Sequence, residues 1–166
     1  YSVRTLARDH RDPGDILDNF NTMFLETVSD PNLFVVVFVG VLDAQSRQLS
    51  YASAGHAGAF LRRGNDVSVL AVTGPVIGLD KNFTYDTNVV ALQEGDLLLL
   101  ATDGLSEARD TSGGFLDESG ALELLAAASL DPQTCADEIV AAVRARSGGT
   151  VGDDLALLAI KIDGSA

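Results

Sequence analysis

The stretch LLLLATDGLSEA, residues 97–108, runs from an apolar segment straight into an acid and a glycine. Residues 97–100 are too few and too apolar to form an exposed helix, and the Glu-Gly-Asp sequence at 94–96 is typical of a turn. The pattern therefore predicts a buried strand that carries Asp103 to the edge of a sheet, where Gly104 turns the chain away.

A second acidic and apolar stretch near the end of the chain mirrors the first. Asp153 and Asp154 come before an apolar segment at residues 155–162, so here the acids precede the strand. If the two strands are antiparallel neighbours, the end of one lies beside the start of the other, and Asp103 meets Asp153. Converging carboxylates repel each other unless a cation lies between them. The two stretches therefore predict a site for a hard divalent metal ion.

The composition indicates one folded domain and argues against a nucleic-acid partner and a membrane segment. The chain has 166 residues, 46% of them hydrophobic and 21% charged, which is enough for a sizeable core. Apolar runs such as residues 33–42 are too short to span a bilayer, so we expect no membrane segment. The net charge of −13 argues against nucleic acid as a partner, because phosphates require basic patches. The single cysteine, Cys135, excludes an internal disulfide and is compatible with the cytoplasm; we expect it to be a small core or surface residue of a helix.

Hydrophobic periodicity and turn residues predict helices on both sides of a series of antiparallel strands. Asp12 and Pro13 form a helix start, and so do Asp131 and Pro132. Separate groups of helices and strands indicate the α+β class. The first expected elements are a partial helix at 1–10 and a helix from 13 to about 28. A strand at 33–42, buried on both faces, is expected to form a hairpin with 48–54, and 59–63 a hairpin with 67–71. A further pair of strands at 83–92 and 96–102, helices at 121–128 and 133–146, and a last strand after Asp154 complete the chain.

Five short motifs follow one another at a characteristic spacing. They are AGH at 54–56, GPVIG at 74–78, EGD at 94–96, TDGLSEA at 102–108 and DD at 153–154. In this order the chain resembles the bacterial SpoIIE/RsbU-type branch of the metal-dependent PPM (PP2C-like) serine/threonine phosphatases, over roughly residues 12–163. The resemblance implies an α-β-β-α sandwich. It also implies that residues 1–166 are a single, N-terminally truncated PPM-type domain, the C-terminal two-thirds to three-quarters of the full domain.

The resemblance also implies a reaction and its residues. Family members hydrolyse phosphoserine and phosphothreonine with water activated by two Mn2+ or Mg2+ ions. Asp103 matches the metal ligand of the family's Thr-Asp-Gly motif and Asp153 the first acid of its Asp-Asp motif, so both are candidate catalytic and metal-binding residues. Asp154 is a further candidate for the metal site. The implied substrate is a phosphorylated anti-sigma-factor antagonist, a STAS-type anti-anti-sigma protein, acted on in the cytoplasm under the control of an upstream sensory or regulatory domain.

The chain departs from the family pattern, and the departures leave alternatives open. No early strand of this sequence carries the family's Gly-Asp-x-x-Asp motif, which supplies a ligand to both metals, because the chain is expected to start within the helix that follows that motif. Ala57 and Ala156 replace a proline and a threonine that are common in the family. One alternative is therefore a non-catalytic, pseudophosphatase-like regulatory or phosphoprotein-binding module. Another is an unrelated acidic interaction domain.

Other residues suggest chemistry but have simpler interpretations. We expect His56 to fix a loop by hydrogen bonds rather than to catalyse, and Glu107 to order the loop after Asp103. Arg62 and Arg63 are expected at a solvated hairpin tip rather than in a phosphate clamp. The glycine-rich residues 74–78 lack the Gly-Lys-Ser/Thr ending of a P-loop and do not open a helix, so they do not indicate a phosphate cradle.

Overall fold

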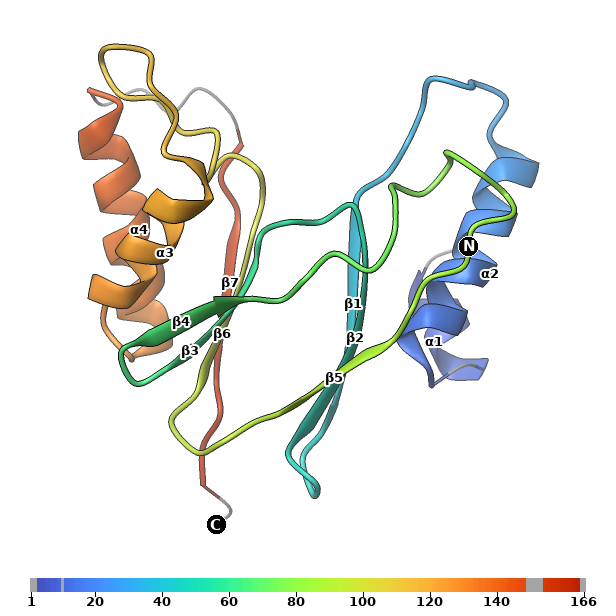
Figure 1. Cartoon of the computed structure of the whole chain (residues 1–166), viewed down its shortest axis with the longest axis horizontal. Coiled ribbons are helices and arrows are strands. Elements are labelled where there is room, and N and C mark those ends of the chain that lie inside the picture. Colours follow the sequence, from blue (N-terminus) through green and yellow to red (C-terminus); the bar gives the residue numbers. More distant parts are fainter. Residues whose placement is uncertain (1–2, 10, 149–153, 165–166) are drawn as a thin grey trace. The chain divides into compact units, whose positions relative to one another are not determined.

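The computed structural model describes residues 3–9, 11–148 and 154–164, and within them the chain forms two compact units (Figure 1). Unit 1 comprises Tyr1–Ala57 and Ala71–Leu92, and unit 2 comprises Gly58–Leu70 and Gln93–Ala166. Each unit is an antiparallel sheet with two helices, at least one of which packs on the sheet, so the α+β class predicted from the sequence is confirmed.

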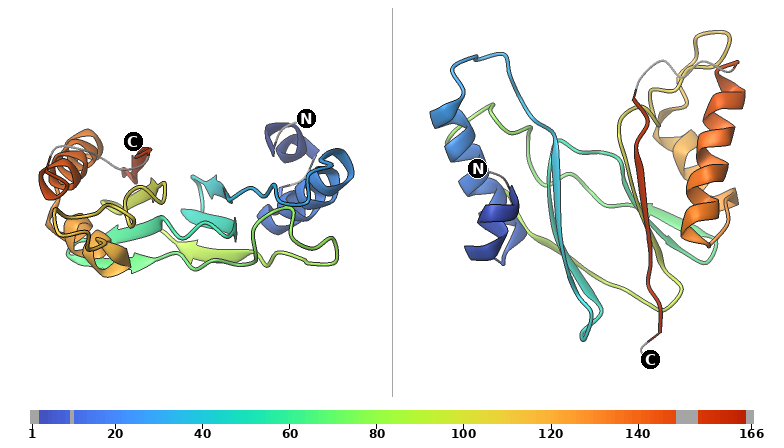
Figure 2. Two further views of the ribbon diagram at one scale, coloured as in Figure 1. Left: turned by 90° about the horizontal axis from the view of Figure 1, so that it is seen from above. Right: turned by 180° about the vertical axis from the view of Figure 1, so that it is seen from behind.

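Unit 1 is a three-stranded sheet covered by helix α2. Its strands are in the order β1-β2-β5, all antiparallel, and α2 packs on β1 and β2 while α1 packs on α2 (Figure 2). Ile16 and Leu17 of α2 are fully buried against the sheet. The elements of unit 1 are α1 (Val3–Asp9), α2 (Pro13–Thr27), β1 (Val37–Asp43), β2 (Gln48–Ala54) and β5 (Asn88–Ala91).

Helix α2 begins where the sequence predicts. The Asp12 carboxylate accepts hydrogen bonds from the backbone N–H groups of Gly14 and Asp15, and Pro13 occupies the first turn. The same carboxylate accepts a 2.6 Å hydrogen bond from the Thr87 hydroxyl, which ties the start of the helix to the segment before β5. These hydrogen bonds, that from Thr87 foremost, lower the pKa of Asp12 although partial burial opposes them.

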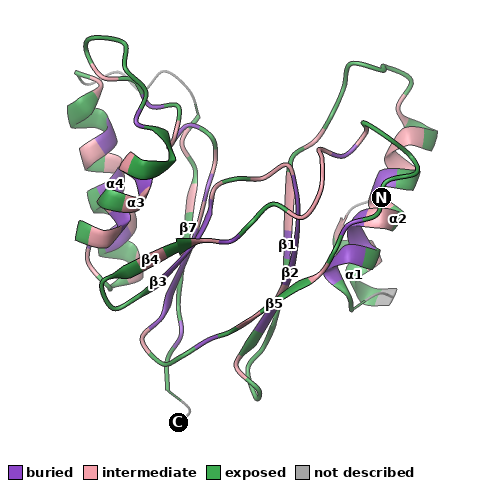
Figure 3. Cartoon of the chain, in the orientation of Figure 1, coloured by how far each residue is buried: buried purple, intermediate pink, exposed green. Residues whose placement is uncertain are grey.

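Unit 2 is a four-stranded antiparallel sheet with α3 and α4 packed against it. The strand order is β4-β3-β6-β7, and every residue of β6 is buried except Leu100, which is intermediate. Figure 3 shows buried residues in the helices of this unit as well as in its strands. Leu97 and Leu99 are fully buried in the same cluster as Ile139 and Val143 of α4. The elements of unit 2 are β3 (Ala59–Arg63), β4 (Asp66–Val69), β6 (Leu97–Ala101), α3 (Asp117–Ala127), α4 (Pro132–Arg146) and β7 (Leu157–Lys161).

Cys135 is one of the core residues of unit 2. It lies on α4 and is fully buried, and burial raises the pKa of its thiol. The structure thereby decides between the core and surface positions that the sequence left open. Within the described residues, no helix has both the length and the apolar character needed to cross a membrane.

The start and the burial expected for the first strand were wrong. The strand expected over residues 33–42 begins only at Val37, and it is not buried on both faces, because Val41 is 37% exposed and Leu42 48% exposed. β1 is the terminal strand in the order of its sheet, and Val35 makes an isolated bridge with Ile77 instead of extending β1.

The strands expected as a pair at 83–92 and 96–102 do not pair with each other. The first begins at Asn88 and lies beside β2 in unit 1, whereas the second, β6, lies between β3 and β7 in unit 2. The turn at 94–96 is present, but it carries the chain from one unit to the other instead of closing a hairpin.

Candidate functional site

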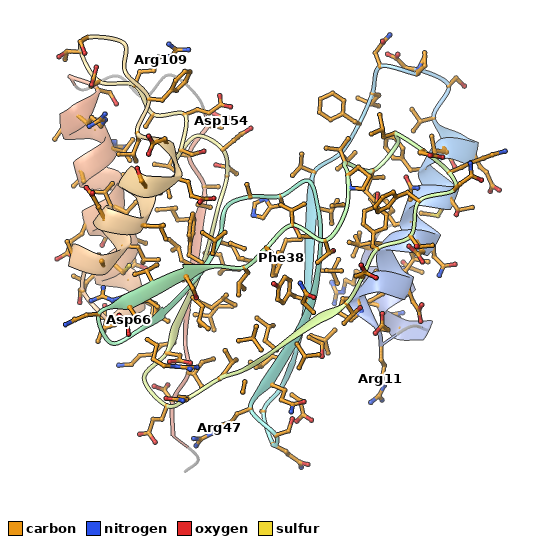
Figure 4. All side chains as sticks on the ribbon, in the orientation of Figure 1. Arg11, Phe38, Arg47, Asp66, Arg109 and Asp154 are labelled. Atoms are coloured by element: carbon orange, nitrogen blue, oxygen red, sulfur yellow. The ribbon has the colours of Figure 1, made fainter. Side chains whose placement is uncertain are left out.

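The end of β6 and the approach to β7 form the candidate site. The two strands pair in antiparallel register from Leu97↔Lys161 to Ala101↔Leu157, which confirms the pairing predicted from the two acidic stretches. The chain leaving β6 therefore lies beside the chain entering β7, at the end of unit 2 where Asp154 is labelled in Figure 4.

Asp103 lies in the turn directly after β6 and is exposed. The Asp103 carbonyl accepts the N–H of Glu107 at 2.8 Å and the hydroxyl of Ser106 at 3.2 Å, so the backbone of Glu107 closes the turn, and the ordering role expected of Glu107 stays a prediction for its side chain. The Asp103 carboxylate makes no hydrogen bond or ion pair with the described residues. Within the part of the chain that the structure describes, nothing therefore competes with a ligand for this carboxylate.

The Asp154 peptide lies against the residues on both sides of Asp103. The Thr102 hydroxyl is 2.7 Å from the Asp154 carbonyl oxygen, to which it donates. A Cβ atom on Gly104 would lie 2.6 Å from the same oxygen, so only glycine fits there without a shift of backbone. The Asp154 side chain is exposed. Asp153, the other acid predicted here, lies outside the described residues.

The oxygen chemistry of this site fits a hard divalent cation. Carboxylate oxygens are the ligands that Mg2+ and Mn2+ prefer, and Asp103 offers a carboxylate with no described partner. Across the described ranges, however, the structure has no group of three or more His, Cys, Asp or Glu side chains that could hold a metal. Among the described residues, Asp103 and Asp154 are the acids at this site that remain candidate ligands.

Arg62 does not lie at a solvated hairpin tip, so that expectation was wrong. Its side chain is only 5% exposed, and its guanidinium donates to the Gly64 carbonyl at 2.8 Å and to the carbonyls of Leu125 and Ala128 at the end of α3. The carbonyl end of a helix carries partial negative charge, which favours a cation. Arg62 is therefore a buried cap of α3.

Arg63 forms an ion pair that the sequence did not reveal. Its Nε and terminal nitrogen lie 3.0 and 2.7 Å from the two carboxylate oxygens of Asp96, which is 1% exposed. Burial alone would raise the pKa of Asp96, but the hydrogen bonds from Arg63 and from the Gln93 N–H outweigh it and lower the pKa. The only local sign of this pair was an acid in the turn at 94–96.

The two remaining motifs belong to the internal structure of unit 1. The His56 ring packs edge-on against Phe38, with 6.1 Å between ring centroids, and the His56 carbonyl accepts the Ser53 hydroxyl at 2.8 Å. In the glycine-rich stretch, the Gly74 N–H donates to the Ser53 carbonyl and the Gly78 N–H to the Asn21 side chain. These amides are engaged within the protein, in agreement with the rejection of a phosphate cradle.

Comparison with known proteins matches this chain to one family. The family model described as stage II sporulation protein E (SpoIIE) matches residues 1–163. Among curated proteins, the phosphoserine phosphatase RsbU of Bacillus subtilis (strain 168) is 29% identical over 127 residues, which cover 75% of this chain and 37% of RsbU. The chain thus spans little more than a third of that relative's length.

Solved structures share the fold. The SiaA-PP2C domain of Pseudomonas aeruginosa superposes with a TM-score of 0.86 at 23% identity, covering 97% of this chain and 66% of that one. The Mn-presoaked phosphatase domain of the cell-fate determinant SpoIIE from Bacillus subtilis has a TM-score of 0.72 at 19% identity, covering 99% of this chain and 71% of that one. The fold of this chain is therefore that of a PP2C phosphatase domain, as the motif order implied.

Proposed function

This chain belongs to the SpoIIE family, and on that premise we propose that it acts as a metal-dependent protein serine/threonine phosphatase. The observation that carries the proposal is the exposed Asp103 carboxylate, without a described partner, held beside Asp154 where β6 and β7 meet. The similarity of the chain to RsbU, a phosphoserine phosphatase, supports the same reaction class.

The residues proposed to hold divalent ions are Asp103, Asp153 and Asp154, of which Asp153 rests on the sequence motif alone. The ions are Mn2+ or Mg2+, two in a complete domain, in line with the Mn-presoaked SpoIIE structure. Such ions lower the pKa of a bound water and neutralise phosphoryl oxygens. The carboxylates supply fixed oxygen donors on two adjoining segments, and Gly104 leaves the space in which those segments approach each other.

The proposed substrate is a phosphorylated STAS-type anti-anti-sigma protein, dephosphorylated in the cytoplasm, with an upstream sensory or regulatory domain setting the activity. The resemblance of the motif series to the SpoIIE/RsbU branch supports this assignment. A site that binds phosphoprotein through divalent ions is also compatible with a chain of net charge −13, because the ions neutralise the acids locally.

The test is phosphate release from a phosphorylated STAS-domain protein with and without Mn2+. We expect release that EDTA abolishes and that Asp103→Asn lowers about 100-fold or more, since loss of a metal ligand removes several kcal/mol of transition-state stabilisation. Asp66→Asn is the matched control, because Asp66 is an exposed acid of the same unit that Figure 4 places far from Asp154.

Two outcomes would contradict the phosphatase assignment in different ways. Undiminished release by the Asp103→Asn protein would show that Asp103 is not a catalytic metal ligand. Tight binding of the phosphoprotein without any metal-dependent release by the parent chain would instead favour the non-catalytic module.

A further inference from the structure

We propose that Thr102 is the positioning residue of this site, because its hydroxyl fastens the start of the β7 segment to the turn that carries Asp103. The inference rests on the proposed metal-dependent function, which it deepens by naming the group that sets the spacing of the acids. Thr102 is not itself a candidate ligand.

The hydrogen bonds at Thr102 show where the β6–β7 ladder gives way to the turn. The Thr102 N–H still donates to the Ala156 carbonyl at 3.0 Å, as a ladder residue should. The Thr102 carbonyl, however, accepts the N–H of Leu105 at 3.1 Å and so begins the turn around Asp103. The Ala156 N–H therefore needs another acceptor if β7 is to stay aligned.

The Thr102 hydroxyl supplies that acceptor. The Ala156 N–H donates to Thr102 Oγ1 at 3.0 Å, and the same hydroxyl donates its proton to the Asp154 carbonyl at 2.7 Å. A hydroxyl can accept and donate at once, whereas the isosteric valine side chain can do neither. One side chain thus holds the peptides of both Asp154 and Ala156 while the backbone of Thr102 turns away.

Gly104 completes the arrangement from the other side of Asp103. Because Gly104 has no Cβ, the Asp154 carbonyl can approach it to a distance that a side chain would forbid. Asp103 is therefore bracketed by two residues that both contact the Asp154 peptide. Since a divalent ion requires its oxygen ligands at set distances, the Thr102 hydroxyl governs the affinity for the ion through the position of Asp154.

The test compares Thr102→Val and Thr102→Ser with the parent chain in Mn2+ titrations followed by calorimetry. We expect Thr102→Val to weaken Mn2+ binding about tenfold or more, the usual effect of removing a group that orients metal ligands. Thr102→Ser keeps the hydroxyl and should stay within about threefold of the parent. Equal Mn2+ affinity in the valine variant and the parent would overturn the inference.

Thr73→Val is the matched control. The Thr73 hydroxyl also accepts a backbone N–H and donates to a carbonyl, in this case both of Ser53, but it lies in unit 1. Its replacement removes the same kind of hydrogen bonds and should leave Mn2+ affinity unchanged. If Thr73→Val weakened Mn2+ binding as much as Thr102→Val, the effect would reflect general loss of structure and the positioning role would be refuted.

A metal-free measurement separates this inference from the proposed function. We expect amide hydrogen exchange at Ala156 to be faster by about fivefold or more in Thr102→Val, and restored in Thr102→Ser. Unchanged exchange at Ala156 would refute the role of Thr102 whether or not metal binds. If the parent chain bound no Mn2+ while exchange behaved as expected, Thr102 would hold the two segments but the metal site itself would be refuted.

Discussion

Three consecutive residues at the end of β6 contribute to the candidate site in different ways. Thr102 holds the Asp154 and Ala156 peptides through its hydroxyl, Asp103 presents a carboxylate that none of the described residues engages, and Gly104 leaves space for the Asp154 carbonyl. Substitution of each residue should therefore produce a different combination of losses in stability, metal affinity and catalysis.

Gly104→Ala should weaken both the fold and the proposed metal site. The new Cβ would lie 2.6 Å from the Asp154 oxygen, a backbone atom that cannot rotate away. We expect the free energy of unfolding to fall by about 1–3 kcal/mol and Mn2+ affinity to fall with it, because the Asp154 peptide must move. Urea unfolding and Mn2+ titration measure the two effects.

Gly164→Ala is the matched control for this substitution. Its Cβ would lie 2.9 Å from the Glu94 carboxylate, the far end of a flexible side chain that can swing aside. The change should stay within about 0.5 kcal/mol of the parent. A Gly104→Ala protein as stable as Gly164→Ala, with parental Mn2+ affinity, would show that the close approach of Asp154 is not required.

Some residues of unit 2 could not be assigned from the sequence because their partners are remote along the chain. Arg62 and Arg63 follow each other at the end of a strand, yet one caps α3 and the other pairs with Asp96. A pair of arginines beside a glycine is equally compatible with a solvated tip. Only the packing of α3 on β3, which no local pattern encodes, distinguishes the two.

At the scale of elements, the chain after the Asp103 turn forms a small hairpin held by polar contacts. An isolated bridge joins Arg109 and Phe115, and the Arg109 guanidinium lies 3.9 Å from the centre of the Phe115 ring. Within the hairpin, the Asp110 carboxylate accepts the Ser112 hydroxyl at 2.6 Å and the N–H groups of Ser112 and Gly114. Arg146, at the end of α4, lies 3.4 Å from the same carboxylate.

These hydrogen bonds, that from the Ser112 hydroxyl foremost, lower the pKa of Asp110 to about 2. Because the folded pKa lies below the unfolded value of 3.8, the hairpin gains stability from Asp110 above about pH 4 and loses it as the pH falls towards 2. A carboxyl-carbon NMR titration should give a midpoint near 2 for Asp110. Ser112→Ala should raise this midpoint towards 3.8.

Ser119→Ala provides the comparison for this titration. The Ser119 hydroxyl bonds to the Asp117 carboxylate at 2.6 Å and is the main cause of the lowered pKa of Asp117. Its removal should raise the pKa of Asp117 and leave that of Asp110 near 2. An Asp110 midpoint close to 3.8 in the parent protein would contradict the hydrogen bonding of the hairpin.

Elements with local signals were predictable, and those that depend on neighbours were not. The starts of α2 and α4 follow from Asp12-Pro13 and Asp131-Pro132, because a cap and a proline act within one turn of helix. Residues 33–42 are apolar enough for a strand buried on both faces, but burial depends on what covers each face, and β1 is covered by α2 on one side. The pairing of β5 and β6 likewise depends on contacts far along the chain.

At the scale of the whole molecule, the two units alternate along the chain, which passes between them after Ala57, Leu70 and Leu92. The proposed site nevertheless belongs to unit 2, because β6 and β7 are adjacent strands of one sheet. Their pairing was predictable because each strand carries an acid at the matching end. The metal-binding role of Asp153 stays a prediction, because this residue lies outside the described part of the chain.

With 24 acidic and 11 basic residues, the folded chain should be destabilised by repulsion among its own charges. Salt screens this repulsion, but it also weakens ion pairs such as Arg63–Asp96 and Arg146–Asp110. The Arg146–Asp110 pair is partly exposed and contributes little to stability. In the Arg63–Asp96 pair, Asp96 is largely withdrawn from solvent, so salt screens this pair weakly. Relief of repulsion should therefore be the larger effect.

Raising NaCl from about 20 mM to about 300 mM at pH 7, without divalent ions, shortens the range of charge–charge repulsion to less than 10 Å. We expect the melting temperature to rise by roughly 2–4 °C, which corresponds to about 1 kcal/mol for a chain of this size. Near pH 4.2, where the net charge is close to zero, the same change in salt should have a smaller effect. Differential scanning calorimetry measures the shift of the melting temperature at each pH. A melting temperature that falls with salt at pH 7 would mean that specific ion pairs outweigh the repulsion created by the net charge of −13.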